Sequence, residues 1–395
     1  MRLWQQEKLK RINLLEGSVR SGKTWISLVL WAFWVATMPE DRSYLMVAKT
    51  LTSLRRNCLD LLVELVGQAN FTYSLPRKEA RLFGRLVYLE GVNDARAESK
   101  IRGMTLQGAY CDELTLFTED FFSMLLSRLS EPDAKLIATT NPDTPSHWLM
   151  ERYINRKDDL DMLVQKFLID DNPFLDAEYV ENLKKEYTGV FYDRFILGEW
   201  VVAEGRVYRQ FADNPEAYIF RNPVAGLDGQ FYVSIDYGTV NPCSMGLWCV
   251  RNREAIRIKE WYFDSRKEGR QMTDEEYYQA LEALTAGYYI RRVIVDPSAA
   301  SFIETIRRHG KFAVWDADNS VLDGIRVTSS LLSAGMLKIH ESCKDAIREF
   351  GLYRWDEKKN EDAVLKENDH AMDDIRYFCY TILAREFSWV EWKRR

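Results

Sequence analysis

Residues 12–34 read INLLEGSVRSGKTWISLVLWAFW, and this stretch decides the class of fold. The spacing G-x-x-x-x-G-K-[ST] is met by Gly17, Gly22, Lys23 and Thr24. In this pattern backbone N–H groups wrap phosphates, the lysine reaches the outer phosphates and the hydroxyl holds Mg²⁺. Apolar runs predict a strand over 12–15 before the loop and a buried helix over 25–38 after it, which favours a nucleotide-binding P-loop over a glycine- and serine-rich surface turn. The predicted ATP-binding set also includes Ser18, Arg20 and Ser21.

Composition places the chain among globular proteins. Its 395 residues predict about two domains, and its 46% hydrophobic and 29% charged residues are typical of a soluble fold. The net charge of −6 gives no general attraction to nucleic acid. The six cysteines lack a C-x-x-C pair, so we expect buried thiols in a reducing cytosol rather than a zinc site or disulfides. The longest apolar run, 25–38, is too short to cross a bilayer and follows no cationic leader, so we expect no membrane association.

Alternation of short apolar runs with helical patterns predicts an α/β fold in three parts. A P-loop ATPase domain with a mostly parallel sheet is expected over 1–170, a helical connecting segment over 171–204 and a second α/β domain over 205–395. In the first domain we expect strands over 44–48, 108–112 and 135–140 and a turn-linked pair over 81–90. In the second we expect strands over 231–235, 244–250, 255–263, 290–295, 311–315 and 337–340, and helices over 274–286 and 368–386.

The first half carries candidates for ATP hydrolysis. Asp112 and Glu113 follow a strand, where one carboxylate can hold Mg²⁺ and the other can orient the attacking water. The alternative is an acidic pair in the first turn of the next helix. Thr139, Thr140 and Asn141 end the next strand, where polar side chains can sense the γ-phosphate, although an ordinary strand-to-turn exit explains the same letters.

Three arginines are candidates for stabilising charge on the transferred phosphoryl group. They are Arg20 in the loop, Arg102 in SKIRGMTLQG and Arg128 in MLLSRLS. The alternative for each is an ordinary solvated surface arginine.

Three aspartates stand out in the second half. Asp236 closes the strand FYVSID, Asp296 closes RVIVD, and Asp373 lies on the last predicted helix. An aspartate after a strand is often only a turn former. The order strand, strand, strand, helix, strand is that of the ribonuclease H-like arrangement, in which carboxylates converge on two divalent ions and activate water against a phosphodiester. Oxygen-only ligands suit Mg²⁺ or Mn²⁺.

Spacing alone does not select the ligand in DHAMDDIRY. Successive residues of a helix project about 100° apart, so Asp373 and Asp374 cannot both face one ion. Asp369 can share a face with Asp373, and His370 can share one with either Asp373 or Asp374. All four side chains could instead line a solvated face.

The ordered set GSVRSGKT, CDE, ATTNP, DNPFL, GEWVVAEGRVYRQF, SIDYG, VDPS and HAMDD resembles the large subunit of tailed-bacteriophage terminases, especially the PBSX-like group. The resemblance implies an ATPase that moves double-stranded viral DNA into a procapsid and a nuclease that cuts the concatemer. It implies the P-loop, Asp112 and Glu113 as the ATPase site, with Mg²⁺ held by Thr24 and Asp112, and Thr139, Thr140 and Asn141 as the coupling motif. Asp236, Asp296 and Asp373 would bind the nuclease metals, with His370 and Asp374 beside them.

The same resemblance implies an adenine-contacting glutamine before the P-loop, for which Gln5 and Gln6 both qualify. It implies a homo-oligomeric ring, expected to be a pentamer, on the portal protein, with a small terminase subunit as partner. The protein would then act in the host cytoplasm and be absent from the mature virion. The alternative function is a helicase-like P-loop motor whose second half is a non-catalytic binding module.

Overall fold

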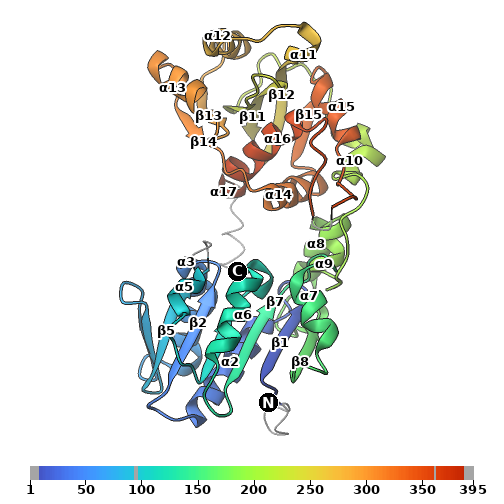
Figure 1. Ribbon diagram of the computed structural model, residues 1–395. Helices are drawn as coiled ribbons and strands as arrows, with labels where there is room; N and C mark the ends of the chain where they lie inside the picture. Colours follow the sequence, from blue (N-terminus) through green and yellow to red (C-terminus); the bar gives the residue numbers. More distant parts are fainter. Residues whose placement is uncertain (1–8, 93–96, 360–361, 387–395) are drawn as a thin grey trace. The chain divides into compact units, whose positions relative to one another are not determined.

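The computed structural model describes residues 9–92, 97–359 and 362–386, drawn in Figure 1. The chain forms two compact units. The first contains 1–180 and 190–202, and the second contains 181–189 and 203–395.

The first unit is built on an eight-stranded sheet in the order β3-β4-β5-β2-β6-β7-β1-β8. Its strands are β1 (Ile12–Gly17), β2 (Ser43–Ala48), β3 (Phe71–Ser74), β4 (Glu79–Leu82), β5 (Arg85–Gly91), β6 (Gly108–Cys111), β7 (Lys135–Thr140) and β8 (Met162–Phe167). All neighbours from β5 to β8 are parallel, whereas β3 and β4 pair antiparallel. The helices are α2 (Lys23–Thr37), α3 (Leu51–Leu54), α4 (Asp60–Val66), α5 (Ala97–Ile101), α6 (Glu119–Arg128), α7 (Trp148–Arg152) and, apart from its first residue, α9 (Gly189–Phe195). The helix α8 (Ala177–Glu186) is divided between the two units after residue 180.

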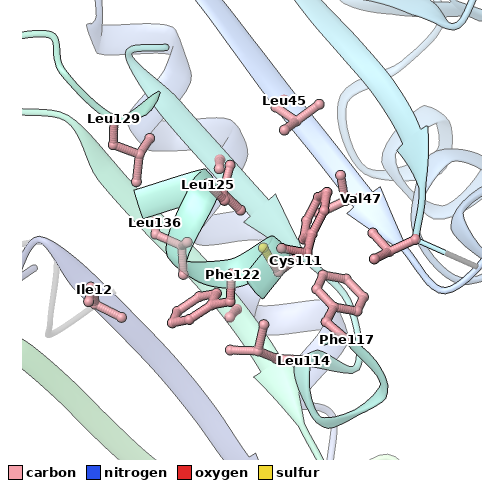
Figure 2. Close-up of a cluster of buried hydrophobic side chains, with 14 of the residues drawn as sticks. Ile12, Leu45, Val47, Cys111, Leu114, Phe117, Phe122, Leu125, Leu129 and Leu136 are labelled. Carbon is pink, nitrogen blue, oxygen red and sulfur yellow. The ribbon is translucent and has the colours of Figure 1, made fainter. Parts of the chain in front are cut away.

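Helices cover both faces of this sheet. Successive side chains of a strand point to opposite faces, so each central strand contributes to two cores. On one face Trp31 and Trp34 of α2 pack edge-on against Tyr44 of β2. On the other face Phe122 of α6 packs into a cluster with Leu136 of β7, shown in Figure 2. Burial on both faces explains why these strands read as continuous apolar runs.

The second unit is built on a seven-stranded sheet in the order β14-β13-β10-β11-β12-β15-β9. Its strands are β9 (Ile219–Phe220), β10 (Gln230–Asp236), β11 (Cys243–Arg251), β12 (Glu254–Phe263), β13 (Ile290–Val295), β14 (Val314–Asp316) and β15 (Leu337–His340). The helices are α10 (Arg209–Asp213), α11 (Ser265–Glu268), α12 (Asp274–Leu284), α13 (Ala300–His309), α14 (Val321–Ser333), α15 (Lys344–Leu352), α16 (His370–Phe378) and α17 (Ala384–Glu386).

An antiparallel meander of β10, β11 and β12 forms the middle of this second sheet, and parallel strands flank it on both sides. On one face Tyr277 of α12 and Phe302 of α13 pack over Val233 and Val295. On the other face α16 packs on the sheet, and its Phe378 stacks on Trp248 with ring centroids 4.4 Å apart. The helix α16 therefore crosses the strands that carry two of the singled-out aspartates.

The expected mixed α/β fold with a parallel-rich sheet is confirmed, with differences at the edges. The short strands β3, β8 and β9 were not predicted, and β14 covers 314–316 instead of 311–315. The predicted helix over 368–386 is interrupted by a π-helical turn at Cys379–Leu383. All six cysteines are free, buried thiols, as expected. No helix in the described part of the chain is long and apolar enough to span a membrane.

Candidate functional site

The loop between β1 and α2 has a backbone shape that depends on two glycines. Gly17 has φ +131°, and a Cβ there would lie 1.9 Å from the carbonyl oxygen of Phe167 in β8. Gly22, the residue before α2, has φ +82°. Residues that carry a Cβ rarely adopt these backbone φ angles, so the local geometry requires glycine at both positions.

The N-terminus of α2 presents unsatisfied donors to this loop. Within the described ranges no side chain caps the helix end, and its first N–H groups have no acceptor within the helix. The hydroxyls of Ser18 and Ser21 are buried without a hydrogen-bond partner among the described residues. Buried polar groups of this kind are normally paired, so the loop fits a bound anion such as a phosphate.

Lys23 is buried at the base of the loop. Its Nζ donates to the Ser18 carbonyl oxygen at 2.9 Å and to Asn141 Oδ1 at 2.6 Å. Burial lowers the pKa of Lys23 to about 8, and the nearby carboxylates of Glu113 and Asp112 oppose this shift. The lysine is therefore held in place by the predicted coupling motif.

Asp112 directly follows β6 at the same sheet edge as the loop. Thr139 Oγ1 donates to its Oδ1 at 2.9 Å, and Asn57 Nδ2 donates to its Oδ2 at 3.0 Å. Glu113 has the left-handed φ of 56°, and its N–H donates to Thr139 Oγ1 at 3.2 Å. Glu113 directly precedes a 3₁₀ turn at Leu114–Leu116 and is its N-cap residue, so the alternative of an acidic pair at a helix start stays open, whereas α6 begins only at Glu119.

The polar end of β7 links these groups. Thr139 contacts Asp112, and Asn141 contacts Lys23. Thr140 Oγ1 donates to Thr115 Oγ1 at 3.0 Å and accepts from the Thr115 N–H at 3.2 Å. A change at the lysine can therefore reach the segment after Asp112 through Asn141, whose side chain bonds the lysine and whose backbone carbonyl oxygen accepts from Thr115 Oγ1 at 3.4 Å.

The candidate arginines are distributed differently. Arg20 lies in the P-loop with φ 56°, and its carbonyl oxygen accepts from Asn172 Nδ2 at 2.8 Å. Arg128 Nη1 donates to the Arg102 carbonyl oxygen at 2.6 Å, while the Arg128 carbonyl oxygen accepts from the Leu106 N–H, just before β6. Arg102 and Arg128 thus lie at the opposite end of β6 from Asp112, away from the P-loop of their own chain. Gln5 and Gln6 lie outside the described residues.

In the second unit, two aspartates lie at the carboxyl ends of neighbouring strands. β10 and β13 are adjacent and parallel, with Ile235 opposite Val295. Asp236 and Asp296 are the next residues, so the carboxyl ends of neighbouring strands bring them together.

One face of α16 reaches both of these aspartates. His370 Nδ1 lies 2.9 Å from Asp236 Oδ2, and the Tyr377 hydroxyl donates to Asp296 Oδ2 at 2.9 Å. Asp373 lies between them on the helix and accepts from Arg376 Nη2 at 2.9 Å. Tyr377 and Arg376 were not singled out from the sequence, although the spacing of 370, 373 and 377 on a helix could have identified the tyrosine.

Burial and neighbouring charges shift the pKa values of three aspartates at this site, in different directions. Burial raises the pKa of Asp236 to about 7, and the charge of Asp373 adds to the shift while His370 opposes it. Burial also raises the pKa of Asp369, with a further contribution from Asp373. For Asp296 burial acts in the same direction, but hydrogen bonds from Ser298, Tyr377 and Asn319 outweigh it and leave its pKa lowered.

A cavity of about 650 Å³ opens at this group. Asp236, His370 and Asp373 line it, together with basic residues that include Lys366 and Arg348, whereas Asp296 does not. Lys366 Nζ lies 3.5 Å from Asp373 Oδ2. The lining combines acidic groups with cations that can contact a phosphodiester.

Asp374 faces the opposite way from Asp373. It is fully buried and accepts from Ser234 Oγ at 2.8 Å, from Ser244, and from both terminal nitrogens of Arg257, one of them at 3.0 Å. Arg257 is itself fully buried. Asp374 is therefore a core ion-pair residue.

The chemistry of the donors fits hard divalent cations at both sites. Near the P-loop the oxygens available are those of Thr24 and Asp112, and in the second unit they are those of Asp236, Asp296 and Asp373. Among these carboxylates burial raises the pKa of Asp236, and a bound cation would favour its charged form. Other side chains of the chain form hydrogen bonds or ion pairs with these carboxylates. Across residues 9–92, 97–359 and 362–386, no three His, Cys, Asp or Glu side chains are grouped so that they could hold a metal ion.

Comparisons with known proteins give one consistent answer. The family model "Terminase large subunit, T4likevirus-type, N-terminal" matches residues 14–213. A solved large terminase from a thermophilic bacteriophage is 35% identical, with a TM-score of 0.90 over 96% of this chain and 97% of that one. The complex of that phage's large terminase with ADP is 36% identical, with a TM-score of 0.87 over 95% and 94% of the two chains. The terminase large subunit of Escherichia phage T5 is 24% identical over 285 residues, which are 66% of this chain and 61% of that protein.

Proposed function

Because the chain belongs to the terminase large subunit family, we propose that it hydrolyses ATP to drive double-stranded viral DNA into a procapsid. The observation that carries this proposal is the bonded set at the P-loop, in which Asn141 holds Lys23 and Thr139 holds Asp112. The ADP complex of the thermophilic phage protein supports nucleotide binding at this fold. The proposed ATPase domain covers 1–170, and 171–204 connects it to the second domain.

Each residue of the ATPase site has a proposed role. The loop over 17–22 binds phosphate oxygens through backbone N–H groups, and Lys23 adds a positive charge. Thr24 and Asp112 would hold Mg²⁺, which neutralises charge on the phosphates when bound. Glu113 orients the attacking water. Since Asn141 accepts a hydrogen bond from Lys23, a phosphate that attracts the lysine would compete with Asn141 and alter the end of β7.

We propose that the domain over 205–395 is a ribonuclease H-like endonuclease that cuts concatemeric DNA at the start and end of packaging. Support comes from the shared edge of Asp236 and Asp296 and from α16, which carries Asp373 to the same cavity as Asp236. Two Mg²⁺ or Mn²⁺ ions held there would activate water and stabilise the leaving oxygen. Arg376 and Lys366 hold Asp373 by charge, and Tyr377 positions Asp296.

The proposed partners follow from this function. They are viral DNA, the portal protein, a small terminase subunit and further copies of the chain in a ring, expected to be a pentamer. The ring would act in the host cytoplasm, docked on the procapsid, and would leave before the virion matures.

Incubation of the full chain with supercoiled plasmid and Mn²⁺, with and without ATP, tests the nuclease half of the proposal. Nicked and linear products are expected. Intact plasmid from a preparation that hydrolyses ATP would favour the alternative of a P-loop motor with a non-catalytic second domain.

A further inference from the structure

An exposed tryptophan lies at the edge strand of the second sheet. Trp315 of β14 is 42% exposed, which is unusual for a side chain of this size in a sheet. The guanidinium of Arg292 in β13 lies 4.7 Å from the centre of its ring. The guanidinium of Arg292 therefore lies over one face of the Trp315 ring, and part of the Trp315 side chain remains exposed to solvent.

Two more arginines surround this tryptophan. A hollow of about 380 Å³ is lined by Trp315 with Arg307 of α13, Arg385 of α17 and the carboxylate residue Asp316. One arginine thus lies over the ring, and two more line the hollow with one aspartate, on a chain whose net charge is −6. An aromatic ring among arginines is the combination that binds nucleic-acid strands, because bases stack on the ring and phosphates pair with the guanidinium groups.

This hollow lies beside Asp296 of the proposed nuclease site. Asp316 pairs with Val295, the residue before Asp296. Thr381, which lines the hollow, follows Tyr377 by about one helical turn, and Tyr377 contacts Asp296. A strand bound at Asp296 would therefore lie next to the hollow.

We propose that Trp315, Arg292, Arg307 and Arg385 form a DNA contact that holds the strand next to the scissile phosphate. The proposal rests on the proposed nuclease function of this domain and adds a binding surface to it. Charge complementarity and the position of the hollow beside Asp296 favour DNA over a protein partner.

Photocrosslinking tests the contact in the full chain. DNA that carries 5-iodouracil crosslinks to aromatic side chains that touch its bases, so single-stranded and duplex oligonucleotides of this kind are irradiated with the protein in the absence of divalent metal. A crosslinked peptide that contains Trp315 is expected. Trp315→Ala should remove it and weaken oligonucleotide binding by about fivefold or more, and Arg307→Ala should weaken binding and reduce its salt dependence.

Matched controls lie elsewhere on the same domain. Tyr289, just before β13, is 88% exposed, so Tyr289→Ala tests loss of an exposed aromatic, and Arg209→Ala on α10 tests loss of an exposed arginine. Neither control should alter the crosslink or the binding. Absence of a Trp315 crosslink together with unchanged affinity of Trp315→Ala would overturn the proposal.

Plasmid cleavage separates this proposal from the nuclease proposal. If the wild-type chain cuts DNA but shows no Trp315 contact, only the contact is wrong. If it crosslinks through Trp315 but never cuts with Mn²⁺, the contact stands and the nuclease proposal fails. When both hold, Trp315→Ala should raise the KM for DNA several-fold with little change in kcat.

Discussion

Replacement of Asp374 by asparagine should destabilise the second unit without removing a metal ligand. Asp374 accepts hydrogen bonds from two serine hydroxyls and two N–H groups of Arg257, and both charged partners are fully buried. Asparagine offers one oxygen and a donor amide in place of the two acceptor oxygens. Among the described residues, the Arg257 charge then has only Glu260, 3.8 Å away, as a carboxylate partner.

Breaking a buried pair on one side costs about 3–5 kcal/mol, and we expect the lower part of this range because asparagine keeps the shape and one acceptor. For a unit of roughly 200 residues, 1 kcal/mol corresponds to about 2–4 °C in Tm. The melting transition of the second unit should therefore fall by about 10 °C. The double variant Arg257→Met/Asp374→Leu should be less destabilised, because it leaves no unpaired buried charge.

Differential scanning calorimetry of the full chain measures this effect, and Asp373→Asn is the matched control. Asp373 faces the cavity and contacts Arg376, which also donates to the carbonyl oxygens of Asn319 and Ser320. The Tm of Asp373→Asn should fall less than that of Asp374→Asn, because the buried Arg376 keeps its two carbonyl acceptors and the repulsion between Asp373 and the carboxylates of Asp236 and Asp369 is relieved, while Mn²⁺-dependent plasmid cleavage is lost. Asp374→Asn should retain much of the cleavage at 20 °C. Unchanged stability of Asp374→Asn, or the reverse order of the two cleavage rates, would refute the assignment.

Three further predictions concern other parts of the chain. Lys23→Ala should abolish ATP hydrolysis, measured by phosphate release, because the buried cation of the P-loop is lost; residual hydrolysis near the wild-type rate would contradict this. Since Arg128 lies away from its own P-loop, it should act on a neighbouring subunit, so mixing Arg128→Ala with Glu113→Ala subunits should restore some ATPase activity, and no recovery in assembled mixed rings would count against it. Burial raises the pKa of Glu186 to about 7, which favours its protonated form in the folded state, so its stability contribution is lost as the pH rises from about 4.5 through 7. Glu186→Gln should therefore raise Tm at pH 8 by an amount that shrinks as the pH falls toward 4.5, and a pH-independent Tm difference would refute the assignment.

The central strands could be predicted from the sequence because they are buried on both faces. Residues 44–48 are a continuous apolar run and 135–140 contain the apolar triplet LIA, and both segments are strands in the structure. The edge strand β8 escaped prediction although MLVQKF is mostly apolar, because only Met162 is buried in it and Gln165 and Lys166 interrupt the apolar run. Edge strands are recognised by their backbone pairing, which single-sequence patterns do not record.

Some residues of the candidate sites could be predicted from the sequence and others could not. Asp236 and Asp296 were identifiable because each ends an apolar run, and their common edge depends only on strand pairing. Asn57 could not be identified, because a π-helical turn at Arg55–Leu59 brings it to Asp112, 55 residues away. Arg257 and Asp374 are 117 residues apart in the sequence, so their ion pair could not be predicted. From the sequence, Arg257 looks like an ordinary charged residue on a strand.

The central claim, that one chain carries an ATP-driven motor and a separate nuclease, is tested most directly by measuring phosphate release and Mn²⁺-dependent plasmid cleavage on the same preparations of two full-length variants. Lys23→Ala should lose phosphate release and still cut plasmid without ATP. Asp236→Asn should release phosphate at close to the wild-type rate and leave the plasmid intact. Loss of both activities in either folded variant, or cleavage by Asp236→Asn at the wild-type rate, would contradict the account.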